Sequence, residues 1–317
     1  MTIGIDLGSH QFRSIRYADD RLIARSCSAV FTTLTDTPAH RRLLQQSSTR
    51  FATCSDHLLV LGDAAREWSA MLNLPLLPLL RSGRVPTSDP ISRQVLTLMI
   101  DALLPSPKES RAICCLTVPG GCHNERVENR DAEFFQQLVS LRGYRPQMIT
   151  ATQALVLAEL HQAAFTGIAI TFGHATCEFG IVHCGREIVR CVVMNGLEGF
   201  EGAPAFGDLL TPQDSTHASA AIERGYSRFF SEVVTEARTQ FERDGTLATL
   251  PQPLPVICTG GITVAPSFLP MLQRIWSESG WPVSTLPIRS AADTVFAVAR
   301  GCLIQAELEQ PSERQVA

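Results

Sequence analysis

The most constraining feature of the sequence is a strand–turn–strand pattern near its start. Residues 2–25 read TIGIDLGSHQFRSIRYADDRLIAR, in which apolar residues alternate with Gly4 and Asp6 as they do in a buried strand. The segment Gly8-Ser9-His10 predicts a tight turn, and a second and a third strand follow it. The pattern therefore predicts a β-hairpin unit with an acidic residue two positions before a glycine.

This pattern occurs a second time in the chain. Residues 168–190 align with the first copy without a gap, so that Ile3 falls on Ile168, Gly8 on Gly173 and Arg25 on Arg190. A third glycine signal, Thr259-Gly260-Gly261, follows downstream. Two such units can hold a polyphosphate from two sides, because backbone N–H groups of each glycine loop face phosphate oxygens and a nearby carboxylate holds a hydrated metal.

Length and composition define the class of protein. A chain of 317 residues that is 45% hydrophobic can bury a large core, and its length fits two lobes. A net charge of −4 without a basic run argues against a nucleic-acid surface. Charged residues interrupt the N-terminal apolar stretch, so no signal peptide is expected, and no apolar run is long enough to span a bilayer. The 10 cysteines include no CxxC pair, which favours buried, reduced thiols and a cytoplasmic location.

Six segments resemble the actin, Hsp70 and sugar-kinase superfamily, and most closely the bacterial actins of the MreB type. They occur along the chain in the same order as in that family. They are GIDLGSH, VLGDAARE, PLLRSGRVPTSDPISRQVLTLMI, AICCLTVPGG, ITFGHATCEFGIV and VICTGGITVAPSF. The resemblance implies an α/β chain with a two-lobed actin-like ATPase (ribonuclease H-like) fold, in which each lobe is a mixed sheet flanked by helices.

The resemblance also implies a division into lobes. Residues 1–150 form lobe I, with a small variable subdomain at about 27–62, and residues 151–290 form lobe II. The outer subdomain of lobe II, which covers the adenine in relatives, is reduced to the Gly- and Pro-rich stretch at about 197–217. Residues 291–317 are expected to supply a helix that returns to lobe I, followed by a tail.

Apolar periodicity predicts the remaining elements. Helices are expected at 63–72, 91–104, 125–142, 151–165, 218–243, 266–279 and 292–308, and strands at 58–61, 112–118 and 256–258. The segment LPLLPLL at 74–80 is broken by prolines, and an extended segment packed at the lobe interface is favoured over a lipid-dipping loop. The polar loop PSPKES disfavours direct membrane insertion, and the tail after Gln310 is expected to be disordered.

The first glycine loop supplies most of the expected ligands of Mg²⁺ and phosphate. By resemblance, Asp6 orients water on Mg²⁺; the alternative is a strand-end carboxylate satisfied by backbone. Gly8, Ser9 and His10 would donate backbone N–H groups to the β- and γ-phosphates. Arg13 falls where eukaryotic actins carry a phosphate-contacting lysine, and the alternative is a solvated strand residue.

The second glycine loop departs from the family pattern. Relatives read D-x-G-G-G-T-[TS]-[DE], whereas this chain reads TFGHATCE, which keeps Gly173 and Thr176 as expected ligands but has Thr171 in place of the aspartate. Two glycines that allow close backbone approach to phosphate are replaced by His174 and Ala175. His174 either donates to a phosphate or fills the space of the γ-phosphate, and the second is favoured.

Hydrolysis also needs a group that positions water. Gln153 aligns with the actin glutamine that does so, whereas bacterial actins and Hsp70 proteins have Glu-Pro, and residues 151–157 include no acid. An amide is a poor base, so slow turnover is expected at best; the alternative is a helix-start residue that faces solvent. Gly260 and Gly261 resemble the adenosine motif, although Ile262 stands where a third glycine is common.

Two functions from different classes follow. The first is a divergent MreB-like protein that binds ATP or ADP with Mg²⁺ weakly, is at most a weak ATPase, and assembles with itself or with a cytoskeletal or cell-division partner in cell shape or segregation. The second is a pseudo-ATPase scaffold that binds a protein partner without nucleotide. A small-molecule kinase is disfavoured, because the region after Val118 offers Gly-Gly-Cys-His instead of a catalytic aspartate.

Overall fold

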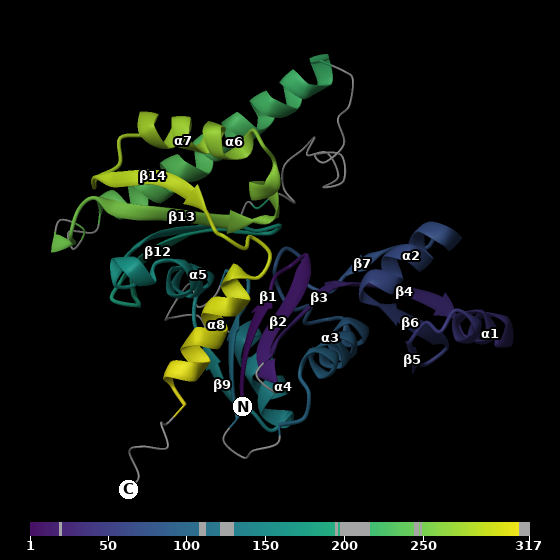
Figure 1. Cartoon of the computed structure of the whole chain (residues 1–317). Coiled ribbons are helices and arrows are strands. Elements are labelled where there is room, and N and C mark those ends of the chain that lie inside the picture. Colours follow the sequence, from purple (N-terminus) through teal and green to yellow (C-terminus); the bar gives the residue numbers. More distant parts are fainter. Residues whose placement is uncertain are drawn as a thin grey trace, which may run out of the picture.

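A computed structural model describes residues 1–18, 21–107, 112–120, 130–193, 196, 216–243, 247 and 249–310, with only the backbone of 216–223. Within these residues the chain forms two five-stranded sheets and one four-stranded sheet, flanked by helices (Figure 1). The expected helix at 125–142 is described only from Arg130, and the stretch at 197–217 lies almost entirely outside the described residues, as does the tail after Gln310.

The two five-stranded sheets share one topology. The first has the order β3-β2-β1-β8-β9 and the second the order β12-β11-β10-β13-β14. In each, the hairpin strands are antiparallel and the fourth strand pairs with the first in parallel. The strands are β1 (Thr2–Leu7), β2 (Gln11–Ala18), β3 (Arg21–Ser28), β8 (Ile113–Thr117), β9 (Arg145–Met148), β10 (Gly167–Phe172), β11 (Cys177–His183), β12 (Arg186–Val193), β13 (Leu254–Gly260) and β14 (Thr285–Ser290). The predicted duplicated, mixed α/β fold is confirmed.

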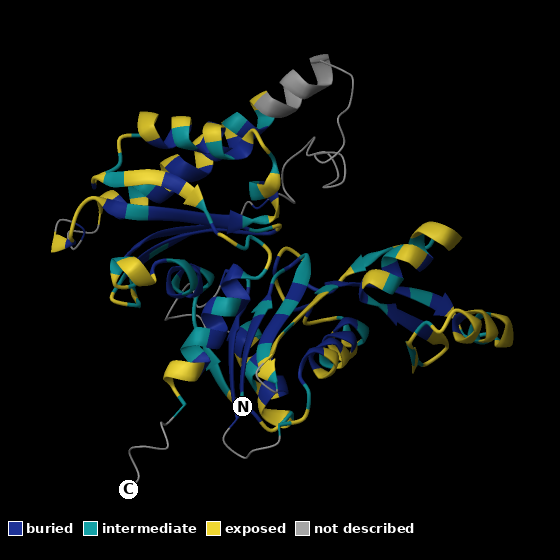
Figure 2. Ribbon diagram, in the orientation of Figure 1, coloured by how far each residue is buried: buried dark blue, intermediate teal, exposed yellow. Residues whose placement is uncertain are grey.

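Helices cover both faces of each sheet. In the first half, α3 (Pro90–Leu103) and α4 (Arg130–Leu141) pack on the face that carries Ile3, Ile5 and Leu7. In the second half, α6 (Thr216–Glu242) and α7 (Phe268–Glu278) pack on the outer face of the sheet through a cluster of aromatic rings (Figure 1). Figure 2 shows that the buried residues follow the sheets and the inward faces of these helices.

Two helices lie between the halves. α5 (Ala151–Glu159) packs on the inner face of the second sheet, and α8 (Ala297–Leu308) runs along β1 of the first (Figure 1). The two helices approach so closely that a Cβ at Gly301 would overlap the carbonyl group of Ala154. A Cβ at Gly4 would likewise overlap the backbone of α8 at Ala299. The α5–α8 contact therefore joins the halves.

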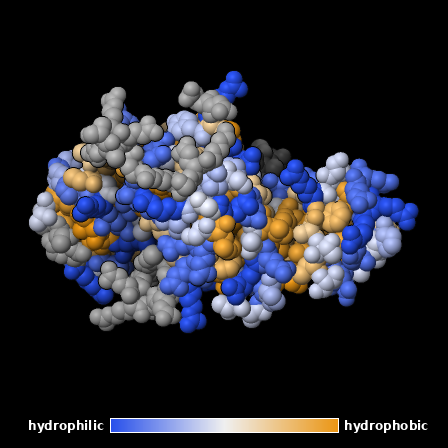
Figure 3. Space-filling model, turned by 90° about the horizontal axis from the view of Figure 1, so that it is seen from below, coloured by the Kyte–Doolittle hydropathy of each residue, from blue (hydrophilic) through white to orange (hydrophobic). Residues whose placement is uncertain are grey.

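The four-stranded sheet lies to one side of the first half (Figure 1). Its elements are β4 (Val30–Thr35), α1 (Pro38–Gln46), β5 (Phe51–Cys54), β6 (His57–Leu61), α2 (Gly62–Leu72) and β7 (Leu77–Pro78). The segment 74–80 is extended, as expected, but the predicted packing at the lobe interface was wrong: Leu74 and Leu76 pack on the core of the four-stranded sheet, and Leu79 and Leu80 belong to the core of the first half. Figure 3 shows that the end of the molecule formed by α1 is mostly hydrophilic.

Two helix predictions were wrong at their ends. The helix predicted at 151–165 stops at Glu159, because Leu160 leaves the helical conformation with φ of −113° and ψ of 31°. A short 3-10 turn at His161–Ala163 follows and ends at Ala164, whose backbone is left-handed with φ of 50°. The helix predicted from 292 begins at Ala297. There the side chain of Asp293 accepts hydrogen bonds from two backbone N–H groups and forms a turn instead. No helix in the described part of the chain is long and apolar enough to cross a membrane.

Candidate functional site

A cleft lies between the two halves where the two glycine turns face each other. Its cavity volume is about 220 Å³. Both expected ligand loops and the third glycine motif contribute to its lining. The predicted residues that line it are Asp6, Gly8, Ser9, His10, Arg13, Gly173, His174, Thr176, Gly260 and Gly261. The structure thus brings ten predicted residues, distant in sequence, to one cleft.

Both glycine turns need glycine for the same local reason. A Cβ at Gly8 would lie 2.9 Å from the carbonyl oxygen of Gln11, and one at Gly173 would lie 2.7 Å from that of Thr176. These distances are shorter than a Cβ tolerates, so each turn is too tight for another residue. The N–H of Gly173 donates to the carbonyl of Thr176 at 2.9 Å, which leaves it unavailable to a ligand.

Asp6 stands at the end of β1, opposite Arg13 on β2. Arg13 Nη1 donates to Asp6 Oδ2 at 3.0 Å, and Thr117 Oγ1 donates to Asp6 Oδ1 at 3.1 Å. Arg13 Nη2 also donates to Gln11 Oε1 at 2.7 Å. Both oxygens of the candidate metal carboxylate are therefore engaged, and Arg13 is its counter-ion rather than a solvated strand residue.

The two glycine turns touch each other directly. The N–H of Ala175 donates to Ser9 Oγ at 3.2 Å. The rings of His10 and His174 lie 5.3 Å apart between centroids, tilted by 53°. The two glycine turns therefore contact each other through Ser9, His10 and His174. Whether His174 fills the position of a phosphate stays a prediction.

Cationic neighbours surround His10. Arg66, from α2, approaches His10 Nε2 at 3.3 Å and also donates to Ser28 Oγ at 2.9 Å. Burial, reinforced by the positive charges of Arg66, His174 and Arg13, lowers the pKa of His10 from 6.5 to about 4. His10 is thus a neutral imidazole at physiological pH. Sequence reasoning missed Arg66, since only the fold brings α2 to this loop.

The third glycine motif has a packing role. Gly260 has φ of +134°, and a Cβ there would overlap the carbonyl group of Phe172 on the neighbouring parallel strand β10. The hydroxyl of Thr259 donates to the carbonyl of Thr294 at 3.1 Å, which fixes the loop before α8 at the cleft. Gly260 is therefore required by close strand contact, whether or not a ligand lies against it.

Gln153 does not line the cleft. Its Nε2 donates to the carbonyl of Gly185 at 2.9 Å, in the turn between β11 and β12. A water-positioning role would require this hydrogen bond to break. The predicted catalytic amide is thus the one predicted site residue that the structure does not bring to the cleft lining.

Glu178 is a cleft residue to which the sequence assigned no role, although it occupies the acidic position of the second loop motif. It is 3% exposed and accepts a hydrogen bond from the N–H of Gly120 at 3.0 Å. Its second oxygen lies 3.6 Å from Arg190 Nε. Burial raises the pKa of Glu178, which Arg190 and the Gly120 N–H partly offset.

A family model described as Volactin matches residues 1–205, which is more than half of the chain. The chain belongs to the Volactin family. This Volactin-family chain has no match among curated proteins.

Solved structures share its fold over nearly the whole length. The chain is similar to the MamK double helical filament, with a TM-score of 0.65 and 13% identity over 98% of this chain and 99% of that one. It is similar to MreB5 of Spiroplasma citri bound to AMPPNP, with a TM-score of 0.67 and 12% identity over 97% and 96%. It is also similar to the apo psk41 ParM protein, with a TM-score of 0.58 and 12% identity over 97% of this chain and 97% of that one. The Volactin-family chain therefore has the two-lobed actin-like fold that the resemblance implied.

The fold implies a nucleotide with Mg²⁺, and the cleft residues of this Volactin-family chain do not fit that group in the present arrangement. Both oxygens of Asp6 are hydrogen-bonded, and Glu178 is paired with Arg190. The Ala175 N–H is bound by Ser9. Among the described residues, no group of three or more His, Cys, Asp or Glu side chains is placed to hold a metal ion.

Proposed function

We propose that this chain is an actin-like assembly protein that acts as a scaffold and associates with copies of itself without requiring Mg-ATP. The observation that carries the proposal is the direct contact between the two phosphate loops, where Ser9 binds the N–H of Ala175 and His10 meets His174. A triphosphate would have to displace these contacts and the Arg13–Asp6 pair.

Self-association is supported by the extent of the fold likeness. The chain matches a subunit of the MamK double helical filament over almost the full length of both. Apo ParM is matched over 97% of each chain, so the likeness to ParM holds for a nucleotide-free relative. We place the role in the cytoplasm, in cell shape or segregation, as the resemblance implies.

We further propose that lobe I (1–150) and lobe II (151–290) act as two bodies closed by residues 291–317. The close contact of α8 with both β1 and α5 supports this division, because α8 touches each half through backbone at Gly4 and Gly301. Only a flexing of this contact would let the cleft open.

Sedimentation and negative-stain microscopy of the purified chain test the proposal. Polymers should appear above one critical concentration that is the same in Mg-ATP, in Mg-ADP and in EDTA without nucleotide. The control is the same protein at high salt and low concentration, which should be monomeric. Assembly that occurs only with Mg-ATP, or no assembly under any condition, would overturn the proposal.

A weak nucleotide-binding function is the second candidate. It is favoured by the side of the cleft away from the phosphate loops, where Gly261, Val295 and Val298 still line open space. Under this alternative, ADP and adenosine raise the melting temperature equally, because the phosphates gain no partners. Asp6→Ala then leaves the adenosine effect unchanged. A larger effect of ATP than of adenosine would favour a working phosphate site instead.

A further inference from the structure

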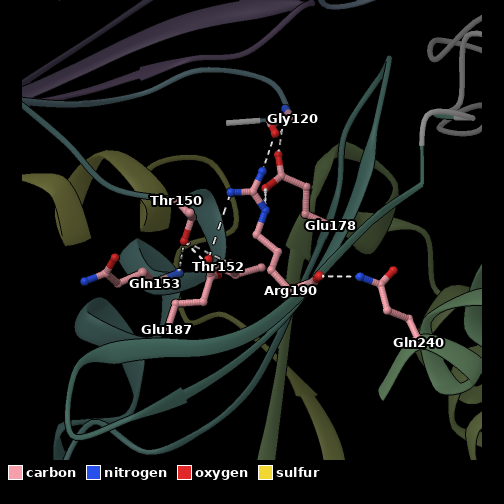
Figure 4. Close-up of polar contacts among 8 residues, drawn as sticks. All are labelled: Gly120, Thr150, Thr152, Gln153, Glu178, Glu187, Arg190 and Gln240. Atoms are coloured by element: carbon pink, nitrogen blue, oxygen red, sulfur yellow. Dashed lines mark hydrogen bonds and ion pairs between the residues drawn. The ribbon is translucent and has the colours of Figure 1, made fainter. Parts of the chain in front are cut away.

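A buried polar cluster connects the two halves at the side of the cleft. It consists of Gly120, which follows β8 in the first half, and of Glu178 and Arg190, on β11 and β12 of the second half (Figure 4). We infer that these three residues form a latch that holds the two lobes at one angle, and that breaking it lets them rotate about the α5–α8 contact. The inference goes beyond the proposed assembly function and does not depend on it.

The first-half side of the latch is a single residue bound at both of its polar groups. The N–H of Gly120 donates to Glu178 Oε1 at 3.0 Å, and the carbonyl of Gly120 accepts from Arg190 Nη2. Gly120 has φ of +68°, a left-handed conformation that favours glycine. This conformation directs the N–H of Gly120 to the carboxylate of Glu178 and its carbonyl to the guanidinium of Arg190.

The second-half side of the latch is charged and buried. Glu178 is 3% exposed and the Arg190 side chain 9% exposed. Buried charges need partners, and removing one partner of such a pair is strongly destabilising because the other remains uncompensated. Glu178 and Arg190 compensate each other at 3.6 Å, and the peptide groups of Gly120 supply hydrogen bonds that their own lobe does not. Separation of the lobes would therefore remove hydrogen bonds from both ions at once.

Arg190 is also held within its own half. Its carbonyl accepts from Gln240 Nε2 of α6 at 2.9 Å, and its Nη1 lies 4.0 Å from Glu187 Oε2. Glu187 in turn accepts hydrogen bonds from Thr150 and Thr152 beside α5 (Figure 4). Arg190 thus contacts α6 through its backbone carbonyl, Glu187 beside α5 through its guanidinium, and the other lobe through Gly120. A change in the angle between the lobes would therefore alter the contacts of Arg190.

The latch and the α5–α8 contact restrain the lobes at two separate places. At α5–α8, backbone meets backbone at Gly301 and Ala154, so sliding there is limited but bending is possible. The Ser9–Ala175 hydrogen bond and the His10–His174 ring contact join the glycine turns. With the latch released, the contacts between the glycine turns and the helix contact remain to hold the angle.

The test is small-angle X-ray scattering of the full chain in the variant Glu178→Met/Arg190→Met, which removes both charges of the Glu178–Arg190 pair and both side-chain partners of Gly120. The matched control is Glu187→Gln, which alters a half-buried acid of the same cluster that makes no described hydrogen bond to Gly120. The latch variant should show a larger radius of gyration and maximum dimension, and the control should not. Unchanged scattering of a folded latch variant, or an equal change in the control, overturns the inference.

A measurement on the unmodified protein keeps the inference testable if that variant does not fold. Native-state hydrogen exchange should show that the amides of Gly120 and Ala175, which both bond across the cleft, open in one event with the same urea dependence. Arg190→Lys, which keeps the charge but loses the second hydrogen-bonding arm, should speed both by about tenfold or more while β13 is unaffected. Independent opening of the two amides contradicts a latch.

Discussion

At the scale of single residues, Arg13, His10 and His174 determine what the cleft can hold. Arg13 pairs with Asp6, the carboxylate for which the resemblance predicts a metal role, and the imidazoles of His10 and His174 lie where the two glycine turns meet. These side chains therefore take up hydrogen-bonding and contact positions at the predicted ligand site. The loops are therefore stabilised by the protein's own groups.

The lowered pKa of His10 predicts a specific pH dependence of stability. Because its folded-state pKa of about 4 lies below 6.5, His10 contributes stability that is fully present above pH 6.5 and is lost as the pH falls toward 4. Since the ring is partly exposed, we expect about 1–2 kcal/mol rather than the full linkage value. Urea unfolding of the unmodified chain and of His10→Asn, from pH 7 to 4, measures this difference.

The difference in stability between the unmodified chain and His10→Asn separates the contribution of His10 from those of other titratable groups. The raised pKa values of Glu178 and Glu187 act in the opposite direction, because these acids contribute stability that is present at low pH and lost as the pH rises through their folded-state pKa. They are common to both proteins and cancel in the difference. Parallel pH profiles for the two proteins would contradict the assignment of His10 as a half-buried neutral imidazole.

The phosphate site should be recoverable by substitution. Arg13→Ser/His174→Gly frees the Asp6 carboxylate and removes the ring from the second loop, so Mg-ATP should now raise the melting temperature. At a ligand concentration 100-fold above Kd the stabilisation is about 2.7 kcal/mol, which raises the melting temperature by about 4 °C for a chain of this size. The matched control, Arg21→Ser/His161→Gly, changes the same residue types at exposed positions and should show no shift. Equal shifts in both variants would refute this account of the loops.

At the scale of elements, the repeated hairpin was predictable and the connections were not. The offset between the two sequence copies places β1 on β10 and β3 on β12 with identical bounds. β4 was missed because Thr32, inside it, is fully buried with its hydroxyl bonded to the carbonyl of Pro75, which hides the alternation. The premature end of α5 depends on the non-helical backbone of Leu160, which no composition signal marks.

The candidate site also has a part that could be predicted from the sequence and a part that could not. The ten lining residues were predictable because they lie in or next to the glycine motifs, which can be recognised in the sequence. Thr117, Arg66 and Arg190 were not, since their partners Asp6, His10 and Gly120 come from distant segments and only the tertiary fold brings them together. The roles of the predicted residues toward a ligand remain predictions.

The α5–α8 contact makes a prediction for single glycines. Gly301→Ala should lower the free energy of unfolding by about 3 kcal/mol or more, because the new Cβ overlaps the backbone of Ala154 and neither helix can yield without moving a lobe. Gly280→Ala is the control: it has open space around it and φ of +65°, so only about 1 kcal/mol of backbone strain is expected. Urea unfolding measures both, and similar losses would show that the close helix contact is not what restrains the lobes.

At the scale of the whole molecule, two matching halves face each other across a cleft and are joined at the helix pair, at the glycine turns and at the latch. In an actin-like chain with these joints, the protein's own contacts hold the two halves together. The proposed assembly should then follow protein concentration rather than nucleotide state.

Titration calorimetry of the unmodified chain with Mg-ATP, repeated on Asp6→Ala, tests this central claim most directly. The account predicts no saturable heat from either protein at millimolar nucleotide, because Ser9, His10 and His174 join the two glycine turns where the phosphates would have to enter. Saturable binding with a micromolar Kd that Asp6→Ala abolishes would contradict it.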